Sequence, residues 1–252
     1  MKSDLTKLEF GKKHHSARNC DMKTLGIIGG LGPESTPDYY QKIVALYREK
    51  TGDDSYPQFF INSMDLNKVR GPVIAGDLSL LTANIVEEIE KLARAGADFG
   101  LIAANTPHIA FGQIAERSPI PLISIVEATC SFAKERNYKT LAVFGTKFTM
   151  NGEFYSQPFS RAGIALALPE PVDQDYIHNK YMNELVAGKF LPETRAGLLA
   201  IVDRMKSKLA IDGVILAGTE LPLILREPSH HGTPLLNTTR IHCQAAVEEM
   251  FG

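Results

Sequence analysis

Asp98-Phe-Gly-Leu-Ile-Ala-Ala-Asn-Thr-Pro-His108 is the stretch of sequence that decides the fold. Its apolar run, 99–104, lies between Gly96 and a group of small hydrogen-bonding residues, a pattern typical of a central strand covered on both faces. The polar residues after the run then lie at the carboxyl end of the strand, where ligands bind in open α/β sheets. The stretch therefore predicts a parallel sheet with a binding site at its edge.

The same pattern returns as Asp212-Gly-Val-Ile-Leu-Ala-Gly-Thr-Glu220, at an offset of 114 residues. Two further segments recur in the same order. Lys23-Thr-Leu-Gly-Ile-Ile-Gly-Gly30 returns as Lys139-Thr-Leu-Ala-Val-Phe-Gly-Thr146, at an offset of 116, and the segment 121–130 returns as 234–243, at an offset of 113. Three ordered matches at nearly one offset indicate a duplicated α/β unit, and a coincidence among apolar strands is the alternative.

The duplication predicts an α/β protein with two similar parallel sheets, whose strand-end loops face each other across a cleft. Because the last strand and helix are needed to finish one unit, we expect the chain to cross back. The expected first lobe is 22–126 plus 228–252, and the second lobe is 127–227. We expect residues 1–21 to form a flexible extension.

Composition favours small solutes as partners. The 252 residues carry a formal net charge of −2, so there is no basic field for nucleic acid or an anionic membrane surface. No apolar run approaches the roughly 18 residues that span a bilayer. Cys20, Cys130 and Cys243 have no metal-ligand spacing and are too few for a disulfide framework, which predicts a reducing, cytoplasmic location. No metal is expected, since His230-His231 without further ligands is typical of a surface loop.

The glycine-rich turn Gly29-Gly-Leu-Gly-Pro-Glu-Ser-Thr36 comes after the first strand and precedes a helix expected over 36–50. Free N–H groups in the first turn of that helix would suit a carboxylate or an anion of phosphate or sulfate size. A dinucleotide site is disfavoured, because Ser35 stands where the third glycine of the fingerprint belongs.

Further elements are expected as strands over 58–65 and 121–125 and as a helix over 79–94. The charged residues of that helix, Glu87, Glu88, Glu90 and Lys91, are interpreted as a solvated face. The loops that would meet at the cleft carry hydroxyls, amides and backbone donors, which suit a small carboxylate. Candidate binding residues are Gly30, Ser35, Thr36, Asp65, Asn105, Thr106, Thr146, Lys147, Thr149 and Thr219.

Three motifs together resemble the aspartate/glutamate racemase family: the segment 26–36, Asn105-Thr-Pro-His108 and Gly218-Thr-Glu-Leu221. The resemblance extends from about Met22 to the C-terminus. It implies two Rossmann-like α/β/α lobes related by a pseudo-twofold, no cofactor, an acidic amino acid held between the lobes, and a homodimer. It also implies a thiolate and a thiol, one from each lobe, on opposite faces of the substrate α-carbon.

This chain departs from the family at those two thiols. Ala104 and Gly218 stand where the resemblance would place cysteines, and neither can carry a proton. Losing one base would leave a lyase or a one-sided proton exchange. Losing both removes two-base racemisation.

His108 and Glu220 are the candidate replacement bases. The alternatives are that His108 orients a neighbour, that Glu220 anchors the next helix and that Asp65 holds a loop. Cys130 and Cys243 fall within expected helices and are interpreted as small buried side chains.

The sequence supports three hypotheses. The first is an amino-acid racemase-family enzyme that uses another base. The second is an isomerase or lyase acting on a related dicarboxylate, and the third is a catalytically silent protein that binds a small carboxylate.

Overall fold

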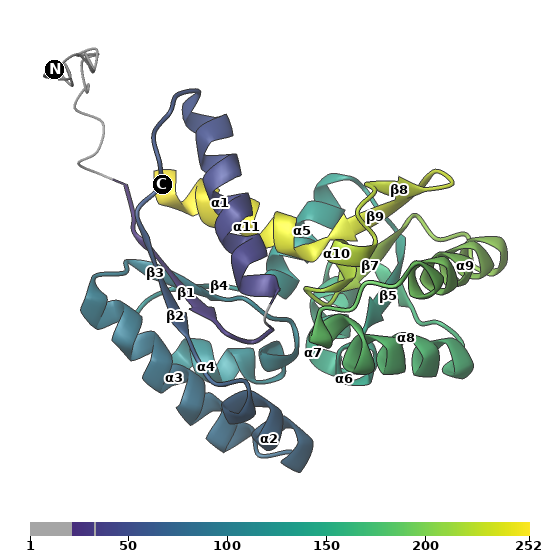
Figure 1. Ribbon diagram of the computed structural model, residues 1–252, viewed down its shortest axis with the longest axis horizontal. Coiled ribbons are helices and arrows are strands. Elements are labelled where there is room, and N and C mark those ends of the chain that lie inside the picture. The colour runs from purple at the N-terminus through teal and green to yellow at the C-terminus, as the bar shows by residue number, and fades with distance from the viewer. Residues whose placement is uncertain (1–21, 33) are drawn as a thin grey trace, which may run out of the picture.

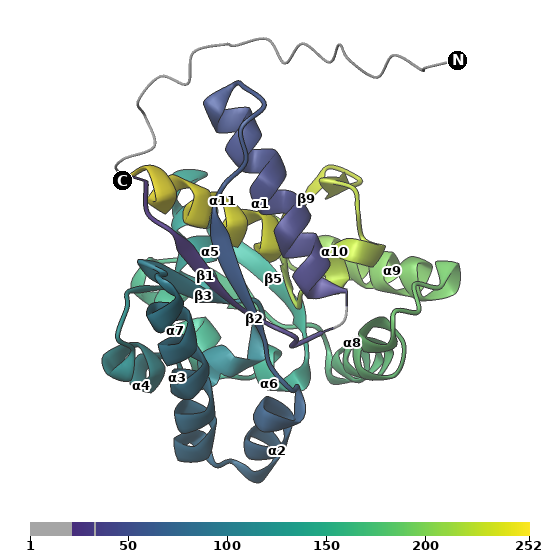
Figure 2. The ribbon, with the colours of Figure 1, turned by 60° about the vertical axis from the view of Figure 1, so that its left-hand side comes forward.

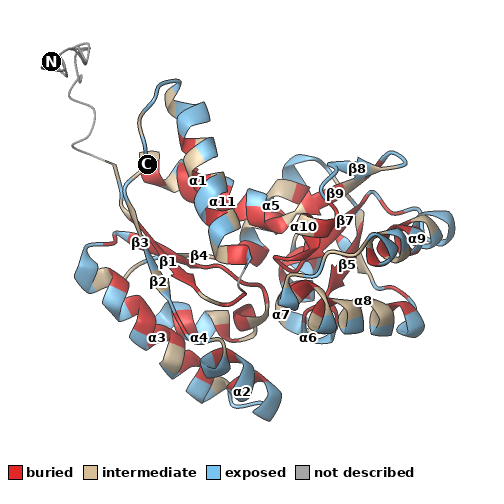
Figure 3. Ribbon diagram, viewed as in Figure 1, coloured by how far each residue is buried: buried red, intermediate tan, exposed pale blue. Residues whose placement is uncertain are grey.

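Two parallel sheets stand side by side in the computed structural model, which describes residues 22–32 and 34–252 (Figure 1). The expected extension 1–21 lies outside the described residues. Helices cover both faces of each sheet. The central strands of each sheet are buried, and the outward faces of the helices are exposed (Figure 3).

The first sheet has the order β2-β1-β3-β4, and its strands are all parallel. Its strands are β1 (Leu25–Gly29), β2 (Phe59–Ser63), β3 (Phe99–Ile102) and β4 (Leu122–Ile123). The helices that come after these strands are α1 (Ser35–Thr51), α2 (Asn67–Ala75), α3 (Leu78–Ala95), η1 (Thr106–Ala110), α4 (Phe111–Arg117) and α5 (Ile125–Glu135).

The second sheet repeats this order as β6-β5-β7-β9 and adds an antiparallel edge strand, β8. Its strands are β5 (Thr140–Gly145), β6 (Ala165–Ala167), β7 (Gly213–Ala217), β8 (Ser229–His230) and β9 (Thr233–Asn237). Its helices are α6 (Lys147–Met150), α7 (Glu153–Arg161), α8 (Pro171–Asn183), η2 (Leu185–Ala187), α9 (Pro192–Lys208), α10 (Leu221–Ile224) and α11 (Thr238–Phe251).

The strand registers confirm the duplication. Leu25 pairs with Phe99 in the first sheet, and the repeat-related Leu141 pairs with Gly213 in the second. The next pairs agree as well, since Gly100 opposes Leu122 and its counterpart Val214 opposes Leu235. Because one register is kept in both sheets, residues that share a place in the repeat also share a place in the fold.

Two repeat-related aspartates explain how the registers are held. Asp98 accepts a 2.7 Å hydrogen bond from the backbone N–H of Thr24, at the start of β1. Asp212 accepts from the N–H groups of Lys139 and Thr140, at the start of β5. Each carboxylate therefore fixes the beginning of the strand paired with its own, where a charged acceptor makes a strong hydrogen bond.

The two halves exchange their last helices. After β4, α5 packs into the core of the second half, where Ile125, Cys130 and Ala133 join Leu141. After β9, α11 returns to the first half, where it lies alongside α1 (Figures 1 and 2). The strand pairing corrects the expected lobe boundary. Residues 229–237 were placed in the first lobe, but β8 and β9 belong to the second sheet, and only α11 crosses back.

Helix α3 agrees closely with its expected span and starts at an Asp77 cap that accepts from the N–H of Leu80. The interpretation of four charged residues of this helix as a solvated face is wrong for Glu88. Glu88 is only 4% exposed, and it accepts from Asn62 on β2 and from Lys68 and Lys91. A carboxylate can be buried in this way because amide and ammonium groups satisfy its oxygens.

Two buried histidines lie where the exchanged helices meet the first sheet. His242 on α11 lies 2.9 Å from the Tyr39 hydroxyl and 2.9 Å from the carbonyl oxygen of Ile123. His108 accepts from the N–H of Ile125 at 3.2 Å, and its ring lies edge-on to that of His242. Burial lowers the pKa of His242 to about 4, and burial and then the charge of His242 lower the pKa of His108 to about 3.

We predict that these histidines make the fold acid-sensitive. Their folded pKa values lie below the ordinary value of 6.5, so the unfolded chain takes up protons first. The free energy of unfolding should therefore fall between pH 6.5 and 4, by about 1.4 kcal/mol per pH unit for each histidine. Urea unfolding at several pH values measures this free energy of unfolding.

His242→Gln is the informative variant, because an amide can both donate to Ile123 and accept from Tyr39 without titrating. The stability difference between wild type and this variant should shrink as the pH is lowered. A difference that stays constant from pH 7 to 4 would contradict the assignment.

Candidate functional site

A cavity of about 440 Å³ lies at the carboxyl ends of the central strands, between the two sheets. Loops after β1, β3, β5 and β7 contribute to it, together with helices α2 and α8. The first half contributes Leu31, Leu66, Val69, Arg70, Val73, Ile74, Ala104, Asn105, Thr106 and Pro107. The second half contributes Thr146, Phe148, His178, Asn179, Tyr181, Met182, Asn183, Val186, Ala217, Thr219 and Glu220.

Asn105 is the clearest candidate for ligand binding in the first half. It lies after β3, is 4% exposed and lines the cavity. Neither its amide nitrogen nor its amide oxygen has a hydrogen-bond partner among the residues that the structure describes. A buried amide without partners is costly, so a polar ligand in the cavity would relieve that cost.

Glu220 and Tyr181 form a buried acid pair on the opposite wall. The Tyr181 hydroxyl donates to Glu220 Oε2, and Thr219 donates to the same oxygen at 3.0 Å. Glu220 is 1% exposed and Tyr181 is 8% exposed. Glu220 lies between β7 and α10 and Tyr181 lies on α8, so the pair joins the end of the sheet to the helix that lines the cavity.

Burial controls the protonation of this pair. Removal from water raises the pKa of Glu220, although hydrogen bonds from Tyr181 and Thr219 act in the opposite direction. Burial and the charge of Glu220 raise the pKa of Tyr181 well above its ordinary value. The phenol therefore keeps its proton, and the carboxyl group carries the negative charge less readily than in water.

Tyr181 occupies the space that a side chain at position 218 would need. A Cβ atom at Gly218 would collide with Cε2, Cζ and Oη of the Tyr181 ring. Gly32 has the same relation to Glu220, since a Cβ there would collide with Glu220 Oε1. The two glycines thus admit the acid pair to the cavity wall, because glycine allows close approach. A cysteine at 218 would displace the phenol.

Ala104 lies at the repeat-related position in the first half, lines the cavity and brings only a methyl group. Its neighbours Asn105 and Thr106 offer amide and hydroxyl groups. Among the described lining residues of the first half, Arg70 on α2 is the only titratable side chain, and it is exposed. The acid–base groups of the cavity are therefore concentrated on the side of Tyr181 and Glu220.

Six sequence-predicted residues line the cavity, and the others do not. Ala104, Asn105, Thr106, Thr146, Thr219 and Glu220 are brought together. Gly30, Ser35 and Thr36, the residues of the expected anion site, make internal hydrogen bonds. The Gly30 N–H donates to the Thr36 hydroxyl at 2.9 Å, and Ser35 donates to the carbonyl oxygen of Ala103 at 3.3 Å. These three residues therefore hold the turn.

The remaining sequence-predicted residues have local contacts outside the cavity. Asp65 is exposed and accepts from the N–H of Asn67, so it holds the loop before α2. Thr149 bonds to Thr146 inside α6, and the Lys147 side chain pairs with Asp175. His108 stacks on Phe111 behind β3, and Gly218 is covered by Tyr181.

The two described cysteines stay away from the cavity. Cys130 and Cys243 are buried in α5 and α11, and their thiols face the carbonyl oxygens of Pro158 and Tyr39. Burial raises the pKa of both thiols. Neither is poised as a thiolate, because a reactive cysteine requires a lowered pKa.

Sequence reasoning missed Arg70, His178 and Tyr181. All three come from helices whose approach to the cavity depends on tertiary packing. His178 accepts from the N–H of Lys147 at 3.2 Å, and burial lowers its pKa. One signal existed in the sequence, since a glycine at the end of a buried strand often marks the close approach of another group. Gly218 gave that signal, but the sequence did not show which residue approaches it.

The family model for Asp/Glu/Hydantoin racemase matches residues 28–246, most of the chain. This chain belongs to that family. The broad specificity amino-acid racemase RacX of Bacillus subtilis is 25% identical over 210 residues, which cover 80% of this chain and 87% of RacX. The resemblance inferred from the three motifs is confirmed.

Solved structures of similar proteins share the fold. An aspartate racemase homologue from Pyrococcus horikoshii OT3 is 28% identical, with a TM-score of 0.76 over 91% of this chain and 99% of that one. A protein from Yersinia pestis described as a candidate Asp/Glu racemase is 25% identical, with a TM-score of 0.82 over 92% of this chain and 100% of that one. Within residues 22–32 and 34–252, no helix is long and apolar enough to cross a membrane.

We predict that Gly218 is required by the position of Tyr181. Gly218→Ala should lower the free energy of unfolding by about 1–3 kcal/mol, because the added methyl group forces the ring to move. Urea denaturation measures the loss, and it should largely disappear in a Tyr181→Ala background.

Gly112→Ala is the matched control. A Cβ at Gly112 meets no atom of the described residues within 4 Å, and the residue lies in helix α4. That change should be neutral or stabilising by up to about 1 kcal/mol. If Gly218→Ala were as harmless as Gly112→Ala, the proposed contact with Tyr181 would be wrong.

Proposed function

We propose that this racemase-family protein binds an amino acid between its two sheets and exchanges the α-proton from one side only. The observation that carries the proposal is the Tyr181–Glu220 pair, which lies where a side chain at Gly218 would stand. The repeat-related Ala104 offers no acid or base. Two-base racemisation needs a proton donor and an acceptor on opposite faces of the α-carbon, and this cavity has one such face.

Charge complementarity favours an amino acid over a plain dicarboxylate. Glu220 brings the negative charge of the cavity and would attract an α-ammonium group. The amide of Asn105 and the nearby hydroxyl of Thr106 would bind the α-carboxylate from the other half. A dicarboxylate would instead place two negative charges near Glu220, which disfavours the isomerase or lyase hypothesis.

The substrate side chain would meet a largely apolar wall. Its members are Leu66, Val69, Val73, Phe148, Met182 and Val186. Arg70 lies beside them and could pair with the second carboxylate of an acidic amino acid. We therefore propose that the site accepts aspartate or glutamate through Arg70 and apolar amino acids through the same wall.

The proton path is set by the hydrogen bond between the pair. The α-proton would pass to the Tyr181 oxygen as the phenolic proton passes to Glu220. Return along the same path would restore the proton to the same face. Because the proton finally rests on a carboxylate, which is a weaker base than a thiolate, we expect exchange to be slow compared with a reaction that uses a tuned thiolate.

We also propose that the chain forms a homodimer in the cytoplasm and needs no cofactor. The free, buried state of Cys130 and Cys243 supports a reducing compartment. Sedimentation velocity on the purified chain would measure the assembly.

We predict that solvent deuterium enters the α-position of a bound amino acid with retention of configuration. Proton NMR in deuterium oxide, on aspartate, glutamate, leucine and methionine, measures the exchange, and chiral chromatography measures racemisation. Exchange should outpace racemisation and should disappear in Tyr181→Phe.

Tyr155→Phe is the matched control, because Tyr155 is a buried tyrosine on α7 that does not line the cavity. It should leave exchange unchanged. Saturable binding without exchange would support the silent binding protein instead. Racemisation as fast as exchange would reveal a second acid–base group opposite Tyr181, and no binding of any amino acid would overturn the proposal.

We further predict that amino-acid binding releases a proton from Glu220. Because the pKa of this carboxyl is raised, part of the population is protonated as the pH falls, and a bound ammonium group favours the ionised form. Affinity should therefore weaken at lower pH.

Calorimetry in two buffers with different ionisation enthalpies counts the released protons. Glu220→Gln should bind more weakly and with less proton release. Equal proton release in wild type and variant would show that another group, such as His178, is responsible.

A further inference from the structure

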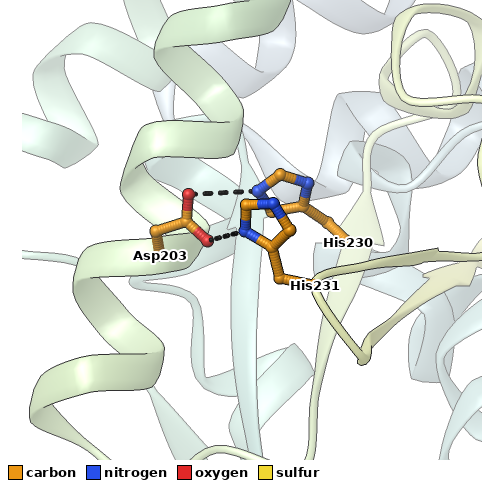
Figure 4. A group of neighbouring side chains, drawn as sticks. All are labelled: Asp203, His230 and His231. Carbon is orange, nitrogen blue, oxygen red and sulfur yellow. Dashed lines mark hydrogen bonds and ion pairs between the residues drawn. The ribbon is translucent and has the colours of Figure 1, made fainter.

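The paired histidines of the β8–β9 hairpin lie against an acidic side chain of α9. His230 Nε2 is 3.1 Å from Asp203 Oδ2, and His231 Nδ1 is 3.1 Å from Asp203 Oδ1 (Figure 4). The ligand atoms of the three residues all lie within 4.8 Å of one another. The further ligand that the sequence analysis lacked is therefore supplied by a helix that precedes the hairpin along the chain.

The backbone of the hairpin brings both rings to the same side. Adjacent residues of an extended strand point to opposite faces of the sheet. His231 instead has a left-handed φ of 45°, and its ring centroid lies 4.0 Å from that of His230. That conformation is unfavourable for a residue that carries a side chain. Its result is that two imidazoles face a single carboxylate.

We propose that Asp203, His230 and His231 form a binding site for a first-row divalent transition-metal ion, with Zn²⁺ as the best match. Two imidazole nitrogens and one carboxylate oxygen are the ligands that Zn²⁺ takes in proteins, and three protein ligands leave a position for water. The N–H hydrogens that face the carboxylate must leave. A neutral imidazole carries its proton on the other ring nitrogen, so both lone pairs can then face the ion.

The surroundings of the site predict a modest affinity. The Lys206 ammonium group donates to the carbonyl oxygen of His231 and opposes a cation. Glu227 acts on His230 electrostatically but is already paired with Arg195 at 2.6 Å. The His231 side chain is 73% exposed, whereas that of His230 is 17% exposed. The ion would therefore bind at the surface and tie the hairpin to α9.

This site is independent of the proposed function. None of its three residues lines the cavity between the sheets. Failure to bind amino acids would not count against the metal site, and failure to bind zinc would not count against the amino-acid site.

The test is zinc binding by the full-length chain after treatment with a chelator. Competition with a chromophoric zinc chelator gives the stoichiometry and affinity, and Co²⁺ in place of Zn²⁺ gives a visible absorption spectrum that reports nitrogen and oxygen ligands. We expect one equivalent bound and a rise in melting temperature, because a metal that binds only the folded state stabilises it.

Four variants make the result specific. Asp203→Asn and His231→Asn each remove one ligand and should weaken binding by about tenfold or more. Asparagine suits position 231, because it tolerates the left-handed backbone and should keep the hairpin folded. Lys206→Met should tighten binding by removing the opposing charge. The double variant His14→Ala/His15→Ala removes the other adjacent histidine pair of the sequence and should have no effect.

Any one of three results would overturn the proposal. The first is no stoichiometric binding at roughly 100 μM Zn²⁺ or below, an affinity that would be too weak for a built site. The second is binding that survives both Asp203→Asn and His231→Asn. The third is binding that disappears with His14 and His15.

Discussion

The parallel pairing of β1 with β3 and of β5 with β7, in one register, is the constraint on which the rest of the molecule depends. Parallel strands end at the same edge of a sheet, so the residues after them are brought together whatever their separation in sequence. Asp98 and Asp212 fix that register by binding the first amides of the neighbouring strands. Because both halves obey the same rule, Asn105 and Thr219 occupy equivalent places on opposite walls of one cavity.

The exchanged helices make the two halves a single unit. Helix α5 leaves the first sheet for the core of the second, and α11 leaves the second sheet for the core of the first. His242 bonds at their meeting point to Tyr39 on α1 and to the carbonyl oxygen of Ile123, close to α5. Movement of one half relative to the other would disturb the buried hydrogen bond from the N–H of Ile125, at the start of α5, to His108 of the first half, and such a group is costly to leave unpaired. The geometry of the cleft is therefore tied to the packing of the helices behind it.

The sequence predicted the features that the strands alone determine, and it failed where side chains meet across the fold. Ala104, Asn105 and Glu220 were predicted to lie at the cleft, because they end buried apolar runs. Gly30, Ser35 and Thr36 do not line the cavity, and their polar groups bond to one another and to the carbonyl oxygen of Ala103. The prediction that the last strand joins the first sheet was wrong as well, because the repeated sequence pattern fits either sheet. Tyr181 could not be placed, because its helix approaches β7 only through tertiary packing.

In the proposed function, a phenol stands where the family resemblance places a thiol, and this difference concerns more than the identity of the acid. A side chain at position 218 would be fixed by strand β7 itself, whereas Tyr181 reaches the same place from α8. Its position therefore depends on how α8 packs and on the hydrogen bond to Glu220. Burial raises the pKa of both groups, so charge separation between them is unfavourable and the proton stays on the phenol. A cation between the walls would stabilise the carboxylate and lower the cost of charge at the pair, so the ammonium group of the proposed ligand would complete the electrostatics of this site.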